Sequence, residues 1–239
     1  MAPAAGVSPP AECAWRFCVN PRHHPASDWL LALGAGTLDE AQAAVVAAHA
    51  EWCPDCRAKV DCAEAIGGAM LASLPPSAMS AGAFARFLQR MAAADNLREQ
   101  GSAAPLNGFA HSGLPLSLAK IVPHGIDVLP WKRLAPGVRG VRLPIHSRHG
   151  IQLCLFEAEP GAVFDSHTHG GSEMSLVLRG AYHVNGLRFG PGDSEDSEPG
   201  SRHMAVADPE EGCLCVAFIE GANRPDGILA RLLQPFKGL

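Results

Sequence analysis

A histidine and two cysteines stand close together in the stretch His49-Ala50-Glu51-Trp52-Cys53-Pro54-Asp55-Cys56. Cys53 and Cys56 have the CxxC spacing with which two thiolates share one metal ion or one disulfide. His49 precedes Cys53 by about one helical turn, so the three side chains can converge on one point. A tetrahedral zinc site needs a fourth ligand, which His23 or His24 can supply from upstream.

The length and charge of the chain narrow the functions that such a site can serve. With 239 residues, the chain has room for one large domain or two modest ones. The net charge of −5 argues against a nucleic acid or an anionic membrane as the main partner. It fits a basic partner protein instead.

The first residues and the cysteine content predict the compartment. Residues 1–21 have no signal-peptide pattern, and no apolar stretch reaches the ~20 residues that span a bilayer. We therefore expect a cytoplasmic protein, in which thiols stay reduced. The eight cysteines are then expected to be metal ligands, redox sensors or core residues rather than a disulfide framework. Residues 1–21, rich in alanine and proline, predict a flexible extension that holds Cys13 and Cys18.

Residues 22–96 have the periodicity and the capping residues of short helices. Four short helices build only a small core, which a structural metal ion can stabilise. The predicted helices are one that Ser27-Asp28 caps and that ends at Gly34 and Gly36, one from a Thr37–Glu40 capping box to about His49, one over about 54–73 with Pro54 in its first turn, and one that Ser80 caps.

The fourth predicted helix carries an apolar stripe. Phe84, Phe87, Leu88 and Met91 recur at i, i+3, i+4 and i+7, which makes the helix strongly amphipathic. Such a stripe favours packing into the protein core, and a partner-binding surface is the alternative. Leu30 and Leu31 in the first helix are further candidates for partner binding.

The composition changes after residue 96. Residues 97–112 predict a linker, and residues 113–239 a second domain with short segments rich in Val, Leu and Phe between glycines and prolines. This pattern is typical of an antiparallel sandwich or small barrel, and Asn185-Gly186 predicts a type I′ hairpin turn within it. The predicted strands are Gly140–Pro144, Ile151–Glu157, Glu173–Leu178, Ala181–Val184 and Leu214–Ile219.

A second group of metal-binding residue types lies in this β region. His167 and His169 are two residues apart, so on a strand they point to the same face. A Gly-Gly bend can bring Glu173 to the same pocket, and His203 follows a Gly-Pro-Gly-Asp turn at 190–193. Three imidazoles and one carboxylate suit zinc or another divalent first-row metal. The spacing resembles the metal-binding pattern of cupins, which are double-sheet jelly-roll barrels.

Two further cysteines alternate on a predicted strand. Cys213 and Cys215 point to one strand face and could meet the barrel interior near the metal. Buried cysteines are often small core residues. The alternative is a role for both thiols in sensing a redox signal.

Together these features resemble one known family, the ChrR-type zinc-binding anti-sigma factors (ZAS family) with a C-terminal cupin domain. The resemblance covers about residues 22–220, and the two motifs in this order make it specific. It is carried by Arg22-His23-His24, Gly36-Thr37-Leu38, His49-x3-Cys53-x2-Cys56, Ala65-Ile66-Gly67-Gly68, the run His167–Gly180 and Gly190-Pro191-Gly192-Asp193.

The resemblance implies an α+β chain of two domains, a small zinc-bound helical bundle followed by an antiparallel β jelly-roll. It implies that the helical domain binds an ECF-type sigma factor and blocks its access to RNA polymerase, without direct contact to nucleic acid. It also implies two zinc ions per chain and a cupin domain that receives an oxidative signal, singlet oxygen or organic peroxide. The implied zinc ligands are His24, His49, Cys53 and Cys56 in the helical domain and His167, His169, Glu173 and His203 in the cupin domain.

A metal-dependent cupin enzyme, of the dioxygenase or isomerase type with a helical accessory domain, is the alternative hypothesis. The cupin ligand set alone does not separate the two hypotheses, because enzymes use it as well. The His/Cys motif favours the regulator, since a dioxygenase does not require it. We therefore predict a regulator without catalytic residues.

Overall fold

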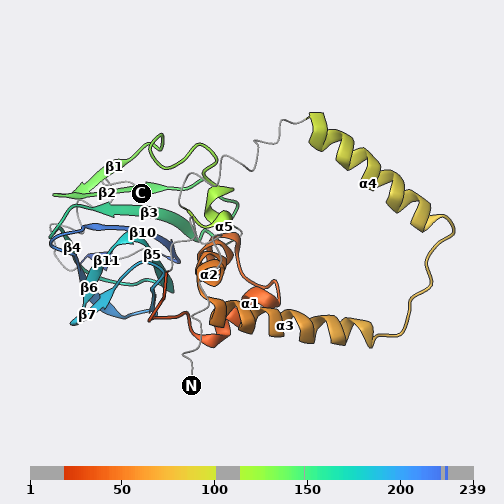
Figure 1. Ribbon diagram of the computed structural model, residues 1–239, viewed down its shortest axis with the longest axis horizontal. Coiled ribbons are helices and arrows are strands. Elements are labelled where there is room, and N and C mark those ends of the chain that lie inside the picture. Colours follow the sequence, from red (N-terminus) through yellow and green to blue (C-terminus); the bar gives the residue numbers. More distant parts are fainter. Residues whose placement is uncertain (1–18, 101–113, 148, 222–223, 226–239) are drawn as a thin grey trace, which may run out of the picture.

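The computed structural model describes residues 19–100, 114–147, 149–221 and 224–225, without the side chains of residues 94–100, 165, 167, 224 and 225. Helices occupy the first half of the chain and strands the second (Figure 1). The predicted α+β class is therefore confirmed. The helices are α1 (Ser27–Gly34), α2 (Glu40–Trp52), α3 (Pro54–Ala72), α4 (Ala83–Gln100) and the short α5 (Leu116–Ala119).

The first helix begins without the predicted side-chain cap. Its N-cap is Ala26, and neither Ser27 nor Asp28 caps the helix. A tertiary contact takes over this role, because the Ala26 amide donates to a carboxylate oxygen of Asp196 at 3.0 Å. Such a long-range partner has no local signal in the sequence.

The second helix has a capping box, but two residues later than predicted. Asp39 is the N-cap, and its amide donates to the Gln42 side chain at 3.0 Å. Thr37 instead donates through its hydroxyl to the Ala32 carbonyl and closes the turn after α1. The predicted box of Thr37 and Glu40 is therefore wrong, because Asp39 is an equally good N-cap residue with its own partner three positions on.

The third and fourth helices follow the prediction more closely. Pro54 occupies the first turn of α3, as expected. Ser80 does not cap α4, which begins at Ala83, and its hydroxyl accepts from the Arg86 side chain instead. The helix continues to Gln100, beyond the predicted start of the linker.

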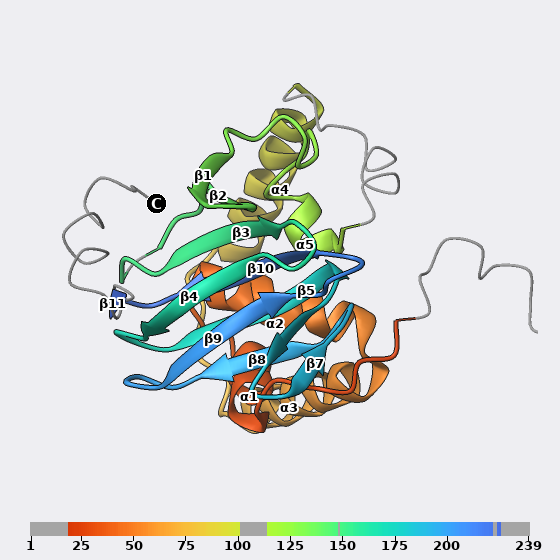
Figure 2. The ribbon, with the colours of Figure 1, turned by 90° about the vertical axis from the view of Figure 1, so that its left-hand side faces the viewer.

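Two antiparallel sheets face each other in the second half of the chain (Figure 2). Six strands pair in the order β1-β2-β3-β10-β5-β8 and five in the order β11-β4-β9-β6-β7. Asn185 and Gly186, with φ of 50° and 80°, form the tight connection of β6 and β7 that a type I′ turn requires. The strands are β1 (Lys132–Ala135), β2 (Val138–Arg142), β3 (Gln152–Ala158), β4 (Val163–Thr168), β5 (Glu173–Gly180), β6 (Tyr182–Val184), β7 (Leu187–Phe189), β8 (Ser194–Ser197), β9 (Arg202–Ala207), β10 (Cys213–Ile219) and β11 (Arg224–Pro225).

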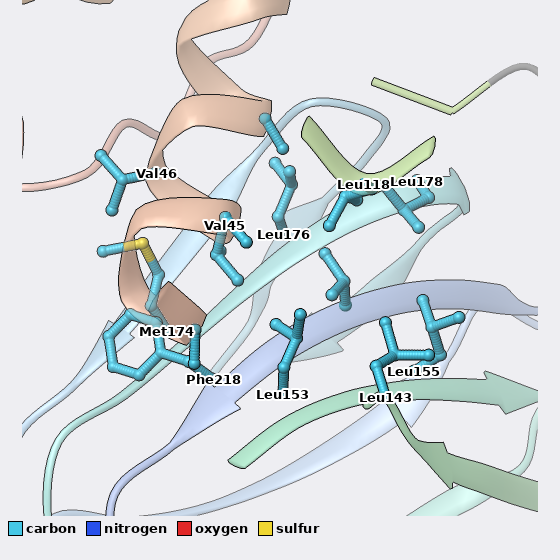
Figure 3. Packing of buried hydrophobic residues seen from close by; sticks show 14 of the residues in the cluster. Val45, Val46, Leu118, Leu143, Leu153, Leu155, Met174, Leu176, Leu178 and Phe218 are labelled. Carbon is cyan, nitrogen blue, oxygen red and sulfur yellow. The ribbon is translucent and has the colours of Figure 1, made fainter. Parts of the chain in front are cut away.

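The six-stranded sheet is buried on both faces. On β10, Leu214, Val216 and Phe218 pack toward α2, while Cys213 and Cys215 belong to the cluster between the two sheets. Figure 3 shows Val45 of α2 above side chains of this sheet, Leu153 and Leu176 among them. One apolar core thus runs from the helices into the sheet. The predicted division into domains 22–96 and 113–239 stays a prediction.

Candidate metal centres and exposed helices

Four side chains from three separate segments meet at one point beside the sheet. His49 comes from the last turn of α2, Cys53 from the junction of α2 and α3, and Cys56 from the first turn of α3. His24 reaches them from the segment that precedes α1. The candidate ligand atoms of the four residues all lie within 4.8 Å of one another. The motif alone left His23 and His24 open as the fourth ligand, and the resemblance implied His24; the structure brings His24 into the group.

The distances in this group fit a tetrahedral zinc site. His24 Nδ1 lies 3.3 Å from His49 Nε2, 3.4 Å from Cys53 Sγ and 3.5 Å from Cys56 Sγ. Tetrahedral zinc with ordinary bond lengths separates two nitrogens by about 3.3 Å and a nitrogen from a sulfur by about 3.6 Å. Two neutral imidazoles and two thiolates balance the charge of Zn²⁺, which suits a closed structural site. We call these four residues the His/Cys site.

Burial shifts the pKa values of two candidate ligands, His49 and Cys56, in opposite directions. It lowers the pKa of His49 to about 4, so this imidazole is neutral and able to bind metal at neutral pH. Burial and the neighbouring Cys53 raise the pKa of the Cys56 thiol to about 12. Without metal, the site therefore holds a protonated Cys56 thiol. Zinc must displace this proton when it binds the sulfur.

The β-strand half of the chain supports the His/Cys site from outside. The Gly192 carbonyl accepts a hydrogen bond from Nδ1 of His49 at 2.8 Å. Asp193 accepts from the backbone amides of Arg22 and His23, at 2.6 and 2.9 Å. Burial alone would raise the pKa of Asp193, but hydrogen bonds from backbone amides lower it below its ordinary value. The sequence identified 190–193 as a turn and as one motif of the resemblance, but gave no sign of these contacts.

A second group of candidate ligands lies between the two sheets. His169 Nδ1 is 3.1 Å from a carboxylate oxygen of Glu173, and the rings of His169 and His203 are 4.7 Å apart. The strand register of β4 and β9 sets His167 opposite His203, but the side chain of His167 lies outside the described part of the chain. Three of the four predicted residues are thus brought together. The donor set suits a divalent first-row metal. We call His167, His169, Glu173 and His203 the barrel site.

Two residues that the sequence reasoning missed extend the barrel site. A carboxylate oxygen of Glu195 lies 3.1 Å from Nδ1 of His203, and the other accepts from the Tyr182 hydroxyl at 2.8 Å. The hydrogen bond to Glu195 raises the pKa of His203 although burial opposes it. Glu195 lies on β8, which lacks an apolar alternation and was not predicted as a strand.

Cys213 and Cys215 face the barrel interior, as predicted. Both are buried, and a hydrogen bond between Cys215 and Cys213 together with burial raises the pKa of Cys215 well above its ordinary value. Cys215 is therefore a thiol at neutral pH, and thiols react with oxidants more slowly than thiolates do. Their sensing role stays a prediction.

The helices that project from the body expose many large apolar side chains. Phe84 is 66% and Phe87 55% exposed, and Figure 1 shows α4 standing apart from the other elements. The expectation that this stripe packs into the core is wrong for the part of the chain that the structure describes. The C-terminal half of α3 and the segment after it are exposed as well. The exposed apolar side chains of this region are Ile66, Met70, Leu71, Leu74, Met79, Phe84, Phe87, Leu88 and Met91.

The two leucines of α1 differ. Leu31 is exposed, as a partner-binding residue should be. Leu30 lies in the core against α2 and α3 and is only 1% exposed. Leu30 is therefore not part of a binding surface, because the helix turns it inward.

Comparisons with known proteins fit this arrangement. Residues 26–57 match the family described as "Putative zinc-finger", and residues 122–221 match the "ChrR Cupin-like domain". The Anti-sigma-E factor ChrR of Cereibacter sphaeroides is 34% identical over 215 residues, which cover 90% of this chain and 97% of that protein.

Solved structures add the same relationship at the level of the fold. A chain in the crystal structure of Rhodobacter sphaeroides SigE in complex with the anti-sigma ChrR matches with a TM-score of 0.67 and 30% identity. The match covers 84% of this chain and all of that one (100%). An acetylacetone dioxygenase from Acinetobacter johnsonii matches 39% of this chain and 66% of its own, with a TM-score of 0.35 and 17% identity, which says nothing about shared chemistry.

No helix in the described residues has the length and apolar character needed to cross a membrane. The zinc-finger match, the cupin-like match and the similarity along almost the whole length point to one family. The chain belongs to the ChrR-type anti-sigma factors.

Proposed function

We propose that this chain binds an ECF-type sigma factor through its helical part, keeps it from RNA polymerase, and so lowers transcription. The relative in Cereibacter sphaeroides is an anti-sigma-E factor, and the solved relative is in complex with SigE. The net charge of −5 suits a basic partner. A sigma factor acts in the cytoplasm, and the proposal includes this location.

The exposed apolar surface of α3 and α4 carries the proposal. Four large side chains form one stripe on α4, and no other described element packs along this helix. Apolar surface of this extent on a monomer marks an interaction site, because leaving it in water is unfavourable. An amphipathic helix with such a stripe is suited to lie in an apolar groove of a partner.

In this proposal the His/Cys site is a structural zinc site. It ties the segment before α1 to the junction of α2 and α3, and so orients the helices that present the apolar surface. Its four ligands leave no open coordination position, which is the mark of a structural site. Loss of one ligand would uncouple these segments, because metal binding and folding are linked.

The barrel site is proposed as the second metal site and as the receiver of an oxidative signal, singlet oxygen or organic peroxide. Three imidazoles and one carboxylate around Zn²⁺ would leave a net charge of +1, which suits a site that still admits a ligand. Cys213 and Cys215 are the candidates for a redox step beside it. In this proposal the cupin half senses the oxidative signal and does not catalyse a reaction, and the helical half binds the sigma factor.

Co-expression with ECF-type sigma factors from the same genome tests the proposal. We expect one of them to co-purify with the full-length chain, and metal analysis to find two zinc ions per chain. No stable complex with any sigma factor, together with turnover of a small substrate and iron in the barrel, would establish a cupin enzyme instead.

A further inference from the structure

The turn before β8 holds one ligand of the His/Cys site in place. Gly192 and His49 are both buried, and the Gly192 carbonyl accepts from Nδ1 of His49 at 2.8 Å. Because a carbonyl only accepts, Nδ1 carries the ring proton and Nε2 points toward His24, whose Nδ1 is 3.3 Å away. A hydrogen bond of this kind orients a metal-binding imidazole and sets its tautomer.

The same turn holds the backbone directly before the other histidine ligand. Asp193 accepts from the amides of Arg22 and His23 through one carboxylate oxygen. The amide of Ser194, the first residue of β8, donates to the His23 carbonyl at 3.1 Å. The residue that follows these contacts is His24, so its backbone position depends on Asp193 and β8.

The other side of this histidine ligand is held as well. The Ala26 amide donates to Asp196 of β8 at 3.0 Å. Gly192 has a φ of 87°, and a Cβ there would lie only 2.3 Å from a methyl group of Val19 and 3.0 Å from Pro21. The segment before α1 and the turn before β8 are therefore packed without a gap, and a shift of one displaces the other.

The opposite face of β8 reaches the barrel site. Glu195 points between the sheets, where it contacts His203 at 3.1 Å and accepts from the Tyr182 hydroxyl at 2.8 Å. Its neighbours Ser194 and Asp196 point the other way, because side chains alternate along a strand. One short strand thus contacts a candidate metal ligand of the barrel on one face and the backbone around the His/Cys site on the other.

We propose that the segment Gly192–Asp196 couples the two metal sites, so that metal in the barrel changes the metal affinity of the His/Cys site and the reverse. The inference rests on the metal-binding part of the proposed function. A metal ion bound to His203 would fix the position of the imidazole ring that contacts Glu195. Glu195 in turn is only about 7 Å along the strand from Asp193. Thermodynamic linkage makes the effect equal in both directions.

Cobalt(II) titration of the full-length chain measures this coupling. Absorption from thiolate to cobalt reports the His/Cys site, and its loss in Cys53→Ser verifies the assignment. The wild-type chain, with metal in the barrel site, is compared with His169→Ala, which disables the barrel site and leaves the contact of Glu195 with His203 in place. We expect the cobalt affinities of the His/Cys site to differ about fivefold or more. Equal affinities would overturn the inference.

Variants of Glu195 test whether the coupling runs from His203 through Glu195 to the segment Gly192–Asp196. Glu195→Ala, made with and without His169→Ala, should abolish the difference in affinity. Glu195→Gln keeps an oxygen that can accept from His203 and should restore the difference. Glu210→Gln, an exposed turn residue of the same type, should leave it unchanged. If Glu195→Ala fails to fold, the exposed Asp196→Ala is measured at the other end of the route, and an undiminished difference in either variant contradicts it.

Sigma-factor binding by the same preparations separates the two proposals. A chain that shows the coupling but binds no sigma factor contradicts the proposed function and supports the inference. A chain that binds a sigma factor with two independent metal affinities contradicts only the inference.

Discussion

The stripe of α4 leads to a prediction that separates binding from stability. Phe84 and Phe87 are mostly exposed, and no described element packs along their helix. The double variant Phe84→Ala/Phe87→Ala should therefore weaken sigma-factor binding and leave the free chain as stable as before. Substitution of a core residue should mainly lower the stability of the free chain instead.

The exposed fractions give the size of the effect. Full burial of a phenylalanine contributes up to about 3 kcal/mol. With 66% of Phe84 and 55% of Phe87 exposed, burial in a complex leaves about 2 and 1.7 kcal/mol to gain at most. Alanine keeps part of this, so we expect a loss of about 2–3 kcal/mol for the double variant. That loss raises Kd about 30- to 150-fold.

Isothermal titration with the co-purifying sigma factor measures Kd, and urea unfolding of the free chain measures stability. The matched control is Gln89→Ala, which lies on the opposite side of the same helix and should change neither quantity. Leu153→Ala, fully buried in the sheet, should lower the free energy of unfolding by about 2–5 kcal/mol.

Two results would refute this reasoning. An unchanged Kd would show that the stripe is not part of the interface. A loss of stability in the free double variant comparable to that of Leu153→Ala would show that the stripe is already packed in the free chain. The expected change in free stability is within about 0.5 kcal/mol.

Three further predictions concern the metal, a cap and the core. Zinc affinity of the His/Cys site should rise about tenfold per pH unit between pH 7 and 8 on account of Cys56, because zinc must displace the proton of this thiol, whose pKa is about 12, while His49, with its pKa of about 4, releases none. Zinc binding measured at both pH values checks this, and an affinity that does not rise with pH would contradict the raised pKa of the Cys56 thiol. Asp39→Ala should lower the free energy of unfolding, measured by urea titration, by about 1 kcal/mol because Asp39 caps α2. Thr37→Ala should lower it by less. A larger effect of Thr37→Ala would support the predicted capping box of Thr37 and Glu40 instead. Phe218→Ala should lower the free energy of unfolding by about 3–5 kcal/mol, because Phe218 packs between the sheet and the helices. Circular dichroism at two wavelengths should show helices and strands unfolding in one shared transition, at a lower midpoint than in the wild type. Two separate transitions would contradict the common core.

The residues of the two candidate metal centres could be named from the sequence because their spacing is mostly local. His49, Cys53 and Cys56 lie around one helix junction, and the CxxC spacing sets two sulfurs near each other in almost any fold of that segment. His169 and Glu173 are similarly close along the chain. Prediction of the Asn185-Gly186 turn succeeded for the same reason, since few residue pairs adopt two successive positive φ angles.

The predictions that failed for α1 and for the α4 stripe depended on contacts, or their absence, between separate elements, whereas the misplaced capping box of α2 was a local error. The start of α1 is set by Asp196, far along the chain, so its own Ser27 and Asp28 carry no cap. Leu30 and Leu31 are identical in chemistry, and only the packing of α1 on α3 turns one inward and leaves the other exposed. Periodicity alone also could not tell whether the α4 stripe faces a core or solvent, because it is the same on an unpartnered helix.

The sequence by itself determined the α+β class, the Asn185-Gly186 turn and the candidate metal-binding side chains, since spacing and residue type act over a few positions. Tertiary structure decided what surrounds them. It chose His24 over His23, because Asp193 engages the backbone of 22–23 and turns the following side chain to the cysteines. It also joined β8 to both candidate metal sites. Glu195 has no motif of its own, and its contacts with Tyr182 and His203 arise only because the fold brings β6, β8 and β9 together. The contacts of Asp193 likewise arise only because the folded chain brings positions some 170 residues apart into hydrogen-bonding distance.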